Sequence, residues 1–169
     1  MIASSKYGVE TEILTTFDND AWAAYESVYA ESWKPREGDA RFLRRMAERE
    51  GKAGCLRLGL ARLDGEVVAA QFWTVENGIA YIHKLAHREA ARQSSAGTIL
   101  SAALFRHVID TDRVSLIDFG TGNDRYKADW MDRNAPLDTI RLYNTRHPAG
   151  LGRYLKARIS ALVHNRQVD

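Results

Sequence analysis

Polar side chains gather around two glycines in the second half of the chain, where a short apolar run ends. Asp118 closes that run, Gly120 and Gly122 follow it, and Tyr126 and Lys127 open the next element. Glycine allows the sharp backbone turn with positive φ that other residues avoid. A turn of this kind between a strand and a helix can hold polar groups at the open end of a sheet. We therefore interpret this stretch as the working site, with Asp118 as an inward-facing carboxylate.

A second stretch, residues 92–98, has the composition of an anion site. Ser94 or Ser95 can cap a helix here, and the first N–H groups of a helix lack intrahelical partners. The aligned peptide dipoles add about half a positive charge at that end. Ala96 and Gly97 are small enough for a phosphate to approach the backbone. Any capped helix start could carry the same residues, so the structural alternative stays open.

Two histidines and the one cysteine are the remaining candidates for chemistry. His83 and His87 are four residues apart, but on a strand they would share a face at a separation of about 13 Å, given a rise of about 3.3 Å per residue. We therefore predict no metal site. Cys55 excludes an internal disulfide and a multi-cysteine zinc site, and it lies in an alternating strand pattern. A buried structural thiol is the interpretation, with a nucleophile as the alternative.

Composition is that of an ordinary soluble domain. The 169 residues are 45% hydrophobic and 27% charged, and 24 basic and 22 acidic residues are mixed along the chain. We expect one domain spanning residues 1–169, a cytoplasmic location, no membrane partner and no nucleic-acid partner. The densest basic run has helical spacing and consists of Arg41, Arg45, Arg49 and Lys52. We interpret it as the solvent-exposed face of a helix, and the alternative is a surface that contacts an anionic ligand.

The elements that must position these residues begin with a strand and two helices. Residues 9–17 are rich in β-branched side chains and predict a strand. Asp18 or Asn19 can cap a helix that Pro35 stops, and Asp39 can cap a second helix. The first helix carries an aromatic stripe that is either core or the wall of an acceptor pocket: Trp22, Tyr25, Tyr29 and Trp33. The second carries the apolar face Phe42, Leu43, Met46 and Ala47.

Three strands then follow with a period of two. The dipeptides Asp64-Gly65 and Asn77-Gly78 are tight-turn signals that join a strand near residues 56–60, a strand at residues 67–75 and a strand at Ile79–His87. Short turns make this an antiparallel meander. An amphipathic helix after residue 95 and a strand at residues 114–119 then imply a parallel pair with a right-handed crossover.

The end of the chain predicts one more strand and one more helix. Residues 137–145 are strand-like, and an amphipathic pattern follows at Leu151, Tyr154, Leu155, Ile159 and Leu162. The fold class is therefore α/β (α+β), with a mixed sheet that contains an antiparallel meander, a crossover helix and a parallel strand pair.

This order of elements resembles the GNAT acyltransferase fold. The family's pyrophosphate motif, Gln/Arg-x-x-Gly-x-Gly/Ala, matches Arg92-x-x-Ser95-x-Gly97, with Ser95 in place of the first glycine. The run from Ser95 to Leu100, together with Asp118-Phe119-Gly120 followed by Tyr126-Lys127, is similar to the CelD-like branch, which is linked to cellulose and exopolysaccharide synthesis and related to FemAB-like transferases. Ala96 stands where that branch commonly has proline. Members often carry a further, degenerate first domain, so the chain is either a fragment or completes its acceptor pocket as a homodimer.

The resemblance implies direct acyl transfer from acyl-CoA, most simply acetyl-CoA, to a small-molecule amine. It implies Tyr126 as the acid for the departing thiolate, and His83 or its rival Asp118 as the base for the ammonium. A packed sheet histidine and an aspartate that binds its own glycine turn are the structural alternatives. Trp33 and Lys127 are candidate acceptor contacts, and Lys127 could instead be solvated. The donor-binding set is Leu85, His87, Arg92, Gln93, Ser94, Ser95, Ala96, Gly97 and Thr98.

Two other functions fit the same fold. A non-catalytic binding module in a polysaccharide-synthesis assembly would keep the donor site without the chemistry. An aminoacyl-tRNA-dependent transferase would use another donor, although the chain lacks the dense basic patch that tRNA binding favours.

Overall fold

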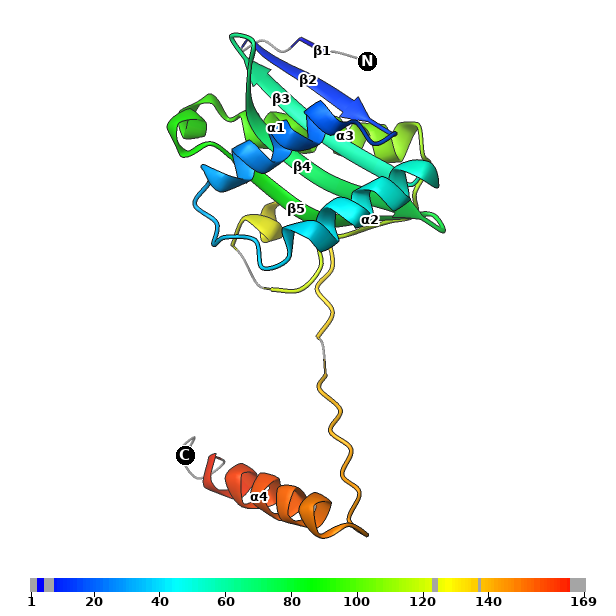
Figure 1. Cartoon of the computed structure of the whole chain (residues 1–169), viewed down its shortest axis with the longest axis vertical. Helices are drawn as coiled ribbons and strands as arrows, with labels where there is room; N and C mark the ends of the chain where they lie inside the picture. Colours follow the sequence, from blue (N-terminus) through cyan, green and yellow to red (C-terminus); the bar gives the residue numbers. More distant parts are fainter. Residues whose placement is uncertain (1–2, 5–7, 123–124, 137, 165–169) are drawn as a thin grey trace. The chain divides into compact units, whose positions relative to one another are not determined.

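The computed structural model describes residues 3–4, 8–122, 125–136 and 138–164. The chain divides into two compact units, Met1–Lys127 and Ala128–Asp169. Within its described residues, the second unit consists of loop, the last part of a short 3₁₀ helix, and the helix α4 (Pro148–His164). The first unit holds the strands and the other helices, so it is described next (Figure 1).

A six-stranded mixed sheet forms the centre of the first unit. Its strands lie in the order in which they occur in the chain: β1 (Ala3–Ser4), β2 (Val9–Leu14), β3 (Leu56–Leu63), β4 (Glu66–Glu76), β5 (Ile79–His87) and β6 (Leu116–Asp118). Neighbouring strands are antiparallel except β5 and β6, which are parallel. The expected meander and the parallel strand pair are confirmed.

The turns of the meander have the backbone that their dipeptides predict. Asp64 and Gly65 both have positive φ, at 51° and 85°, and Asn77 and Gly78 have φ of 51° and 75°. Two successive positive φ values define the type I′ turn, which matches the twist of a hairpin. The antiparallel pairing of β3, β4 and β5 follows from these turns.

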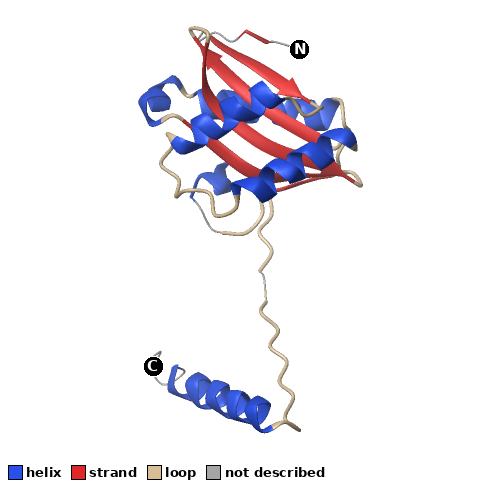
Figure 2. Cartoon of the chain, viewed as in Figure 1, coloured by secondary structure: helices blue, strands red, loops and turns tan. Residues whose placement is uncertain are grey.

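Helices cover both faces of the sheet (Figure 2). On one face, α1 (Asn19–Ala30) and α2 (Ala40–Lys52) pack with Leu58 and Phe72 into one apolar cluster. On the other, α3 (Ala96–Asp110) packs with Trp73 and Ala80 into a second cluster. Burial of these two faces is the main force that holds the layers together.

Both helices of the first layer begin at the caps expected from the sequence. The Asp18 carboxylate accepts a hydrogen bond from Ala21 N at 2.8 Å, and Asp39 accepts one from Phe42 N at 2.9 Å. These bonds satisfy first-turn donors that have no intrahelical partner. The connection between the two helices therefore has defined ends, at Glu31 and Asp39.

Three expectations about the elements are wrong. Helix α1 ends at Ala30, before Trp33, and the α1–α2 loop takes over there. Phe42 is 54% exposed and does not belong to the core face of α2. Residues 138–145 form loop and turn rather than a strand, while residue 137 lies outside the described residues. Alternation of apolar side chains predicted that strand, but alternation supplies no partner strand.

Strand β5 contains a β-bulge that the sequence did not predict. Phe72 of β4 is opposite Lys84, but the next residue, Trp73, is opposite Ile82, so His83 is the extra residue. A bulge shifts the alternation of side chains beyond it. His83 and Lys84 consequently face the α1–α2 layer, and His87, which pairs with Ala69, belongs to the α3 face. The expectation that His83 and His87 share a face is therefore wrong.

The described part of the chain contains no helix that is long and apolar enough to cross a membrane.

Candidate active site

An unpaired strand edge lies at the centre of the candidate site. Strand β6 pairs only with the first residues of β5, where Ile79 is opposite Leu116 and Tyr81 is opposite Asp118. Within the described residues, the rest of β5, residues 82–87, has no strand beside it on that side. An open edge presents backbone N–H and C=O groups that can bind an extended ligand.

The open edge of β5 leads to the start of α3 through a 3₁₀ helix, η1 (Glu89–Ser94). Ser95 precedes α3 with φ of 57°, in the left-handed region where the family motif has glycine. Ser94 Oγ donates to Ala91 O at 2.6 Å and accepts from Ala96 N at 3.3 Å. Ser94, rather than Ser95, therefore supplies the side-chain cap.

The first turn of α3 has room for a ligand at Gly97. The first intrahelical hydrogen bond runs from Ile99 N to Ser95 O at 3.0 Å, so the N–H groups before it point out of the helix end. A Cβ on Gly97 would lie 3.5 Å from His87 Cδ2, an ordinary contact, and Gly97 does not have positive φ. Neither packing nor backbone conformation requires glycine there.

The other donor-binding candidates surround this helix start. Leu85 and His87 are partly buried on β5. The Arg92 side chain is 75% exposed and lies 3.5 Å from Glu89, and Gln93, Ser95 and Thr98 are exposed. These exposed side chains are accessible to an anionic ligand, and their donor-binding role stays a prediction.

Gln71 is a further residue at this site, and the sequence analysis missed it. It is 1% exposed on β4 and donates to Gly97 O at 3.1 Å and to Ser101 Oγ at 2.8 Å. Its Oε1 accepts a hydrogen bond from Trp73 Nε1 at 3.0 Å. Gln71 thereby holds the first turn of α3 against the sheet. A glutamine in a strand of apolar residues was the only available signal.

His83 lies at the bulge with its ring against the α1–α2 layer. Its Nε2 is 2.7 Å from Thr74 Oγ1, and its ring centroid is 5.0 Å from that of Phe72. Burial lowers the pKa of His83, the negative field of Glu50 opposes that shift, and Lys84 adds to it. His83 is therefore a neutral imidazole near pH 7, the form that can accept a proton.

The glycine turn after β6 is held by the two polar residues that the sequence singled out. Asp118 Oδ1 accepts a hydrogen bond from Gly120 N at 2.7 Å, the contact that the structural alternative predicts, while its role as a base stays a prediction. Asp118 is exposed, so the expectation of an inward-facing carboxylate is wrong. Lys127 is 4% exposed and donates to Phe119 O at 3.1 Å and to Thr121 O at 2.7 Å. Its contact with an acceptor stays a prediction.

Tyr126 lies in the short 3₁₀ helix η2 (Arg125–Asp129) and is 37% exposed. It directly precedes the buried Lys127, so the hydrogen bonds from Lys127 to the glycine turn also hold the backbone of Tyr126 in place. Its role as the acid stays a prediction.

The α1–α2 loop runs along the open half of β5. Glu31 forms an ion pair with Arg88, and the ring centroids of Trp33 and His87 are 4.4 Å apart. Farther along, Glu37 Oε2 lies 2.6 Å from Lys84 Nζ. Trp33 is 52% exposed at the end of β5 nearest α3, where an acceptor contact remains a prediction.

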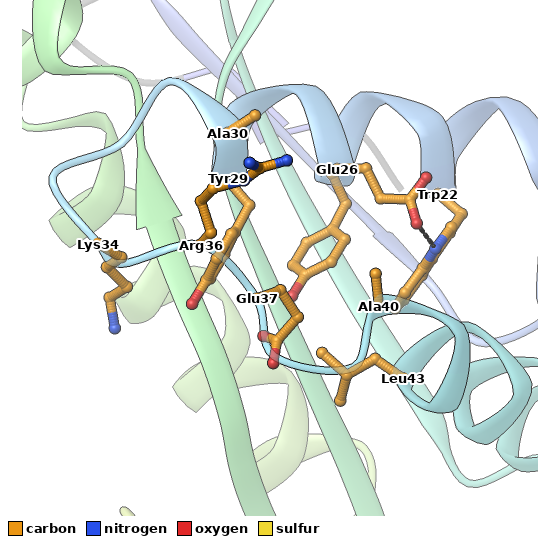
Figure 3. Close-up of a pocket in the computed structure, with 10 residues that line it drawn as sticks. Trp22, Glu26, Tyr29, Ala30, Lys34, Arg36, Glu37, Ala40 and Leu43 are labelled. Atoms are coloured by element: carbon orange, nitrogen blue, oxygen red, sulfur yellow. Dashed lines mark hydrogen bonds between the residues drawn. The ribbon is translucent and has the colours of Figure 1, made fainter.

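A cavity of about 230 Å³ lies between α1, this loop and the start of α2 (Figure 3). Aromatic, carboxylate and cationic side chains line it together with small apolar ones: Trp22, Tyr25, Glu26, Tyr29, Ala30, Lys34, Arg36, Glu37, Ala40 and Leu43. Phe72 contacts both Trp22 and His83, at ring-centroid distances of 5.5 and 5.0 Å. The cavity therefore lies on the same face of the sheet as His83.

The first unit thus contains the open edge of β5, the start of α3, the neutral imidazole of His83 and the cavity beside α1. Within the described ranges, no group of three or more His, Cys, Asp and Glu side chains is arranged to hold a metal ion. Such an arrangement can bind a long anionic ligand along β5 and a second, smaller molecule beside it.

Solved structures with the same fold are acetyltransferases by name. AAC(6')-Iy, bound to the bisubstrate analogue CoA-S-monomethyl-acetylneamine, superposes with a TM-score of 0.57 at 12% identity, over 79% of this chain and 99% of that one. An aminoglycoside acetyltransferase from an uncultured soil metagenomic sample, in complex with trehalose, gives a TM-score of 0.56 at 16% identity, with 83% and 97% covered. The ribosomal-protein-S18-alanine N-acetyltransferase from Escherichia coli gives 0.55 at 13% identity, with 71% and 74% covered. At these identities the likeness shows the fold.

Comparison with curated proteins gives no match. The family model described as the acetyltransferase (GNAT) domain matches residues 4–128, which include strands β2 to β6 and helices α1 to α3. The chain belongs to the GNAT acetyltransferase family.

Proposed function

We propose that this protein is an acyl-CoA-dependent N-acyltransferase that transfers an acyl group, most simply acetyl, directly to the amine of a small molecule. The observation that carries the proposal is the open edge of β5 at residues 82–87, which leads to an α3 start with space at Gly97. A pantetheine arm can hydrogen-bond to such an edge, and a pyrophosphate is favoured at a helix N-terminus.

The residues of the chain have distinct tasks in this reaction. Acyl-CoA supplies an activated thioester, and transfer forms a C–N bond as the C–S bond breaks. His83, neutral through burial, takes the proton that the attacking amine loses. Tyr126 gives its phenolic proton to the departing sulfur. Asp118 and Lys127 hold the glycine turn that precedes Tyr126.

The more specific predictions from the sequence also belong to this proposal. Membership of the CelD-like branch rests on the run from Ser95 to Leu100 and on Asp118-Phe119-Gly120 followed by Tyr126-Lys127. The cytoplasmic location and the homodimer stay predictions.

Thermal unfolding with and without coenzyme A tests the donor site. Coenzyme A should raise the Tm of the wild type, because a ligand that binds only the folded state stabilises it. Gly97→Asp should abolish this shift, since it places a carboxylate where the pyrophosphate would lie. Without coenzyme A the variant should melt at or slightly above the wild-type temperature, because an acidic residue suits a helix N-terminus.

Gly97→Ala is the matched control. Its methyl group makes only an ordinary contact with His87, so the fold should be intact and part of the coenzyme A shift should remain. Equal shifts in the wild type and Gly97→Asp would remove the α3 start from the donor site. A wild type that binds coenzyme A but releases no thiol with any amine would favour the binding-module alternative.

A further inference from the structure

The carboxylates of the cavity between α1 and the α1–α2 loop differ in how their charges are balanced. Burial raises the pKa of Glu37, but Lys84 of β5, at 2.6 Å, and the backbone hydrogen bonds from Gly38 and Asp39 together hold it below its ordinary value. Glu26 is half-buried, and the ion pairs formed by the described residues do not include it. Among the residues that the structure describes, its hydrogen-bond donor is Trp22 Nε1, 2.9 Å from Oε1. One carboxylate of the cavity is therefore held in place but not neutralised.

The two cations that line the cavity are less well placed to neutralise Glu26. The ammonium of Lys34 lies 5.5 Å from the centroid of the Trp33 ring, and Figure 3 shows Lys34 pointing away from the other labelled side chains. Arg36 is exposed, so water and salt screen its charge more than that of the half-buried Glu26. The charge of Glu26 is therefore less balanced than that of Glu37.

The tyrosine in the cavity wall lies in the field of the same carboxylates. Tyr25 is 2% exposed, and burial raises the pKa of its hydroxyl, with further contributions from Glu37, Tyr29 and Glu26. Aromatic rings of Trp22, Tyr25 and Tyr29 make up much of the wall. Rings of this kind attract cations through their electron-rich faces and also pack against carbon chains.

We infer that this cavity binds the acceptor, and that the acceptor is a small amine with a second positive charge, a diamine or an amino sugar with two amino groups. Glu26 binds the ammonium that does not react, and the aromatic rings pack against the carbon body. The second amino group is directed towards β5, where Lys84 contacts Glu37 and Tyr29 and His83 is the adjacent residue. This inference rests on the proposed acyl transfer and names its acceptor class.

Three acceptors that differ only at one end test the inference. They are 1,4-diaminobutane, butylamine and 4-aminobutanoate, with positive, neutral and negative second ends. The rate of thiol release from acetyl-CoA gives kcat/KM for each. We expect the order diamine, butylamine, aminobutanoate, with about a tenfold or greater advantage for the diamine, as for a charge-assisted hydrogen bond.

Glu26→Gln should remove most of the advantage of 1,4-diaminobutane over butylamine, measured as the ratio of their kcat/KM values. The amide oxygen can still accept the Trp22 Nε1–H bond, so the fold should be kept. Glu10→Gln is the control, because Glu10 is exposed on β2 and the substitution changes the net charge equally. An equal loss in both variants would assign the preference to the overall charge and overturn the inference, as would a preference for 4-aminobutanoate.

Direct binding separates failure of this inference from failure of the proposed function. If coenzyme A raises the Tm and amines are acetylated without a diamine preference, the inference fails and the acyltransferase stands. If neither coenzyme A binding nor thiol release occurs, the proposed function fails. Calorimetric titration of 1,4-diaminobutane into the wild type and Glu26→Gln then tests whether the cavity binds the diamine, independently of catalysis. Weaker binding by the variant supports the inference, and equal or absent binding overturns it.

Discussion

His83 combines partial burial with one specific hydrogen-bond partner, and each has a chemical effect. Contact with Thr74 Oγ1 at 2.7 Å fixes the ring, and burial against Phe72 disfavours the imidazolium. Residue type and strand position were enough to nominate His83 from the sequence. Its neutral state depends on the side chains packed around it, including Glu50 and Lys84, which no local pattern predicts.

The lowered pKa of His83 predicts a pH dependence of stability. Between that lowered value and the ordinary value of 6.5, the unfolded chain binds a proton that the folded chain does not. Stability should therefore rise with pH through this window and fall as the pH drops below about 6.5. His83→Gln should flatten this part of the curve. Urea unfolding of both proteins from about pH 5 to 7.5 measures it, and parallel curves would contradict the shift.

Tyr126→Phe tests the proposed acid. The ring and its packing are kept, so the Tm should change little, while loss of the proton donor should lower kcat by ~10²–10⁴-fold with coenzyme A binding nearly intact. Thiol release with the best amine, beside thermal melts, provides both readouts. A tyrosine with a purely structural hydroxyl would instead lose about 1 kcal/mol of stability and keep its turnover.

At the scale of elements, the first turn of α3 depends on β4 through Gln71. Gln71→Leu would leave Trp73 Nε1 without its partner in a buried place and would remove the bond to Gly97 O, at a cost of about 1–3 kcal/mol. We also expect weaker coenzyme A binding, because the helix start would no longer be held in one position. Ser101→Ala is the control that removes only one of the three hydrogen bonds. Unchanged Tm and coenzyme A affinity in Gln71→Leu would contradict this role.

Elements with local signals were predictable, and those that depend on distant partners were not. Asp18 and Asp39 cap their helices, and the Asp64-Gly65 and Asn77-Gly78 turns are hairpins, because the stabilising atoms lie within a few residues. The bulge at His83, the hydrogen bonds of Gln71 and the carboxylates of the cavity arise from packing between layers. The strand expected at residues 137–145 failed for the same reason, since a strand forms only beside another strand.

At the scale of the first unit, the two apolar clusters explain why the α/β fold class could be predicted from the sequence. One cluster lies under α1 and α2 and the other under α3, and each collects the alternate residues of β3 and β4. Helical and strand periods in the sequence mark those residues directly. The order of strands also followed from the chain, because each strand pairs with the next one in sequence. The cavity could not be predicted from the sequence, because its walls come from two helices and a loop.

The bulge at His83 divides β5 into two half-strands of opposite phase. Before it, the even-numbered residues Ala80 and Ile82 face α3; after it, the even-numbered Lys84 and Ala86 face α1 and α2. A substitution at residue 83 keeps both phases. Deletion of that residue would remove the bulge and leave Ile82 opposite Trp73 and Lys84 opposite Phe72, so both halves of the strand would keep their faces and only the His83 side chain would be lost from the α1–α2 face. The bulge therefore adds one side chain, His83, to the α1–α2 face without changing the strand pairing on either side of it.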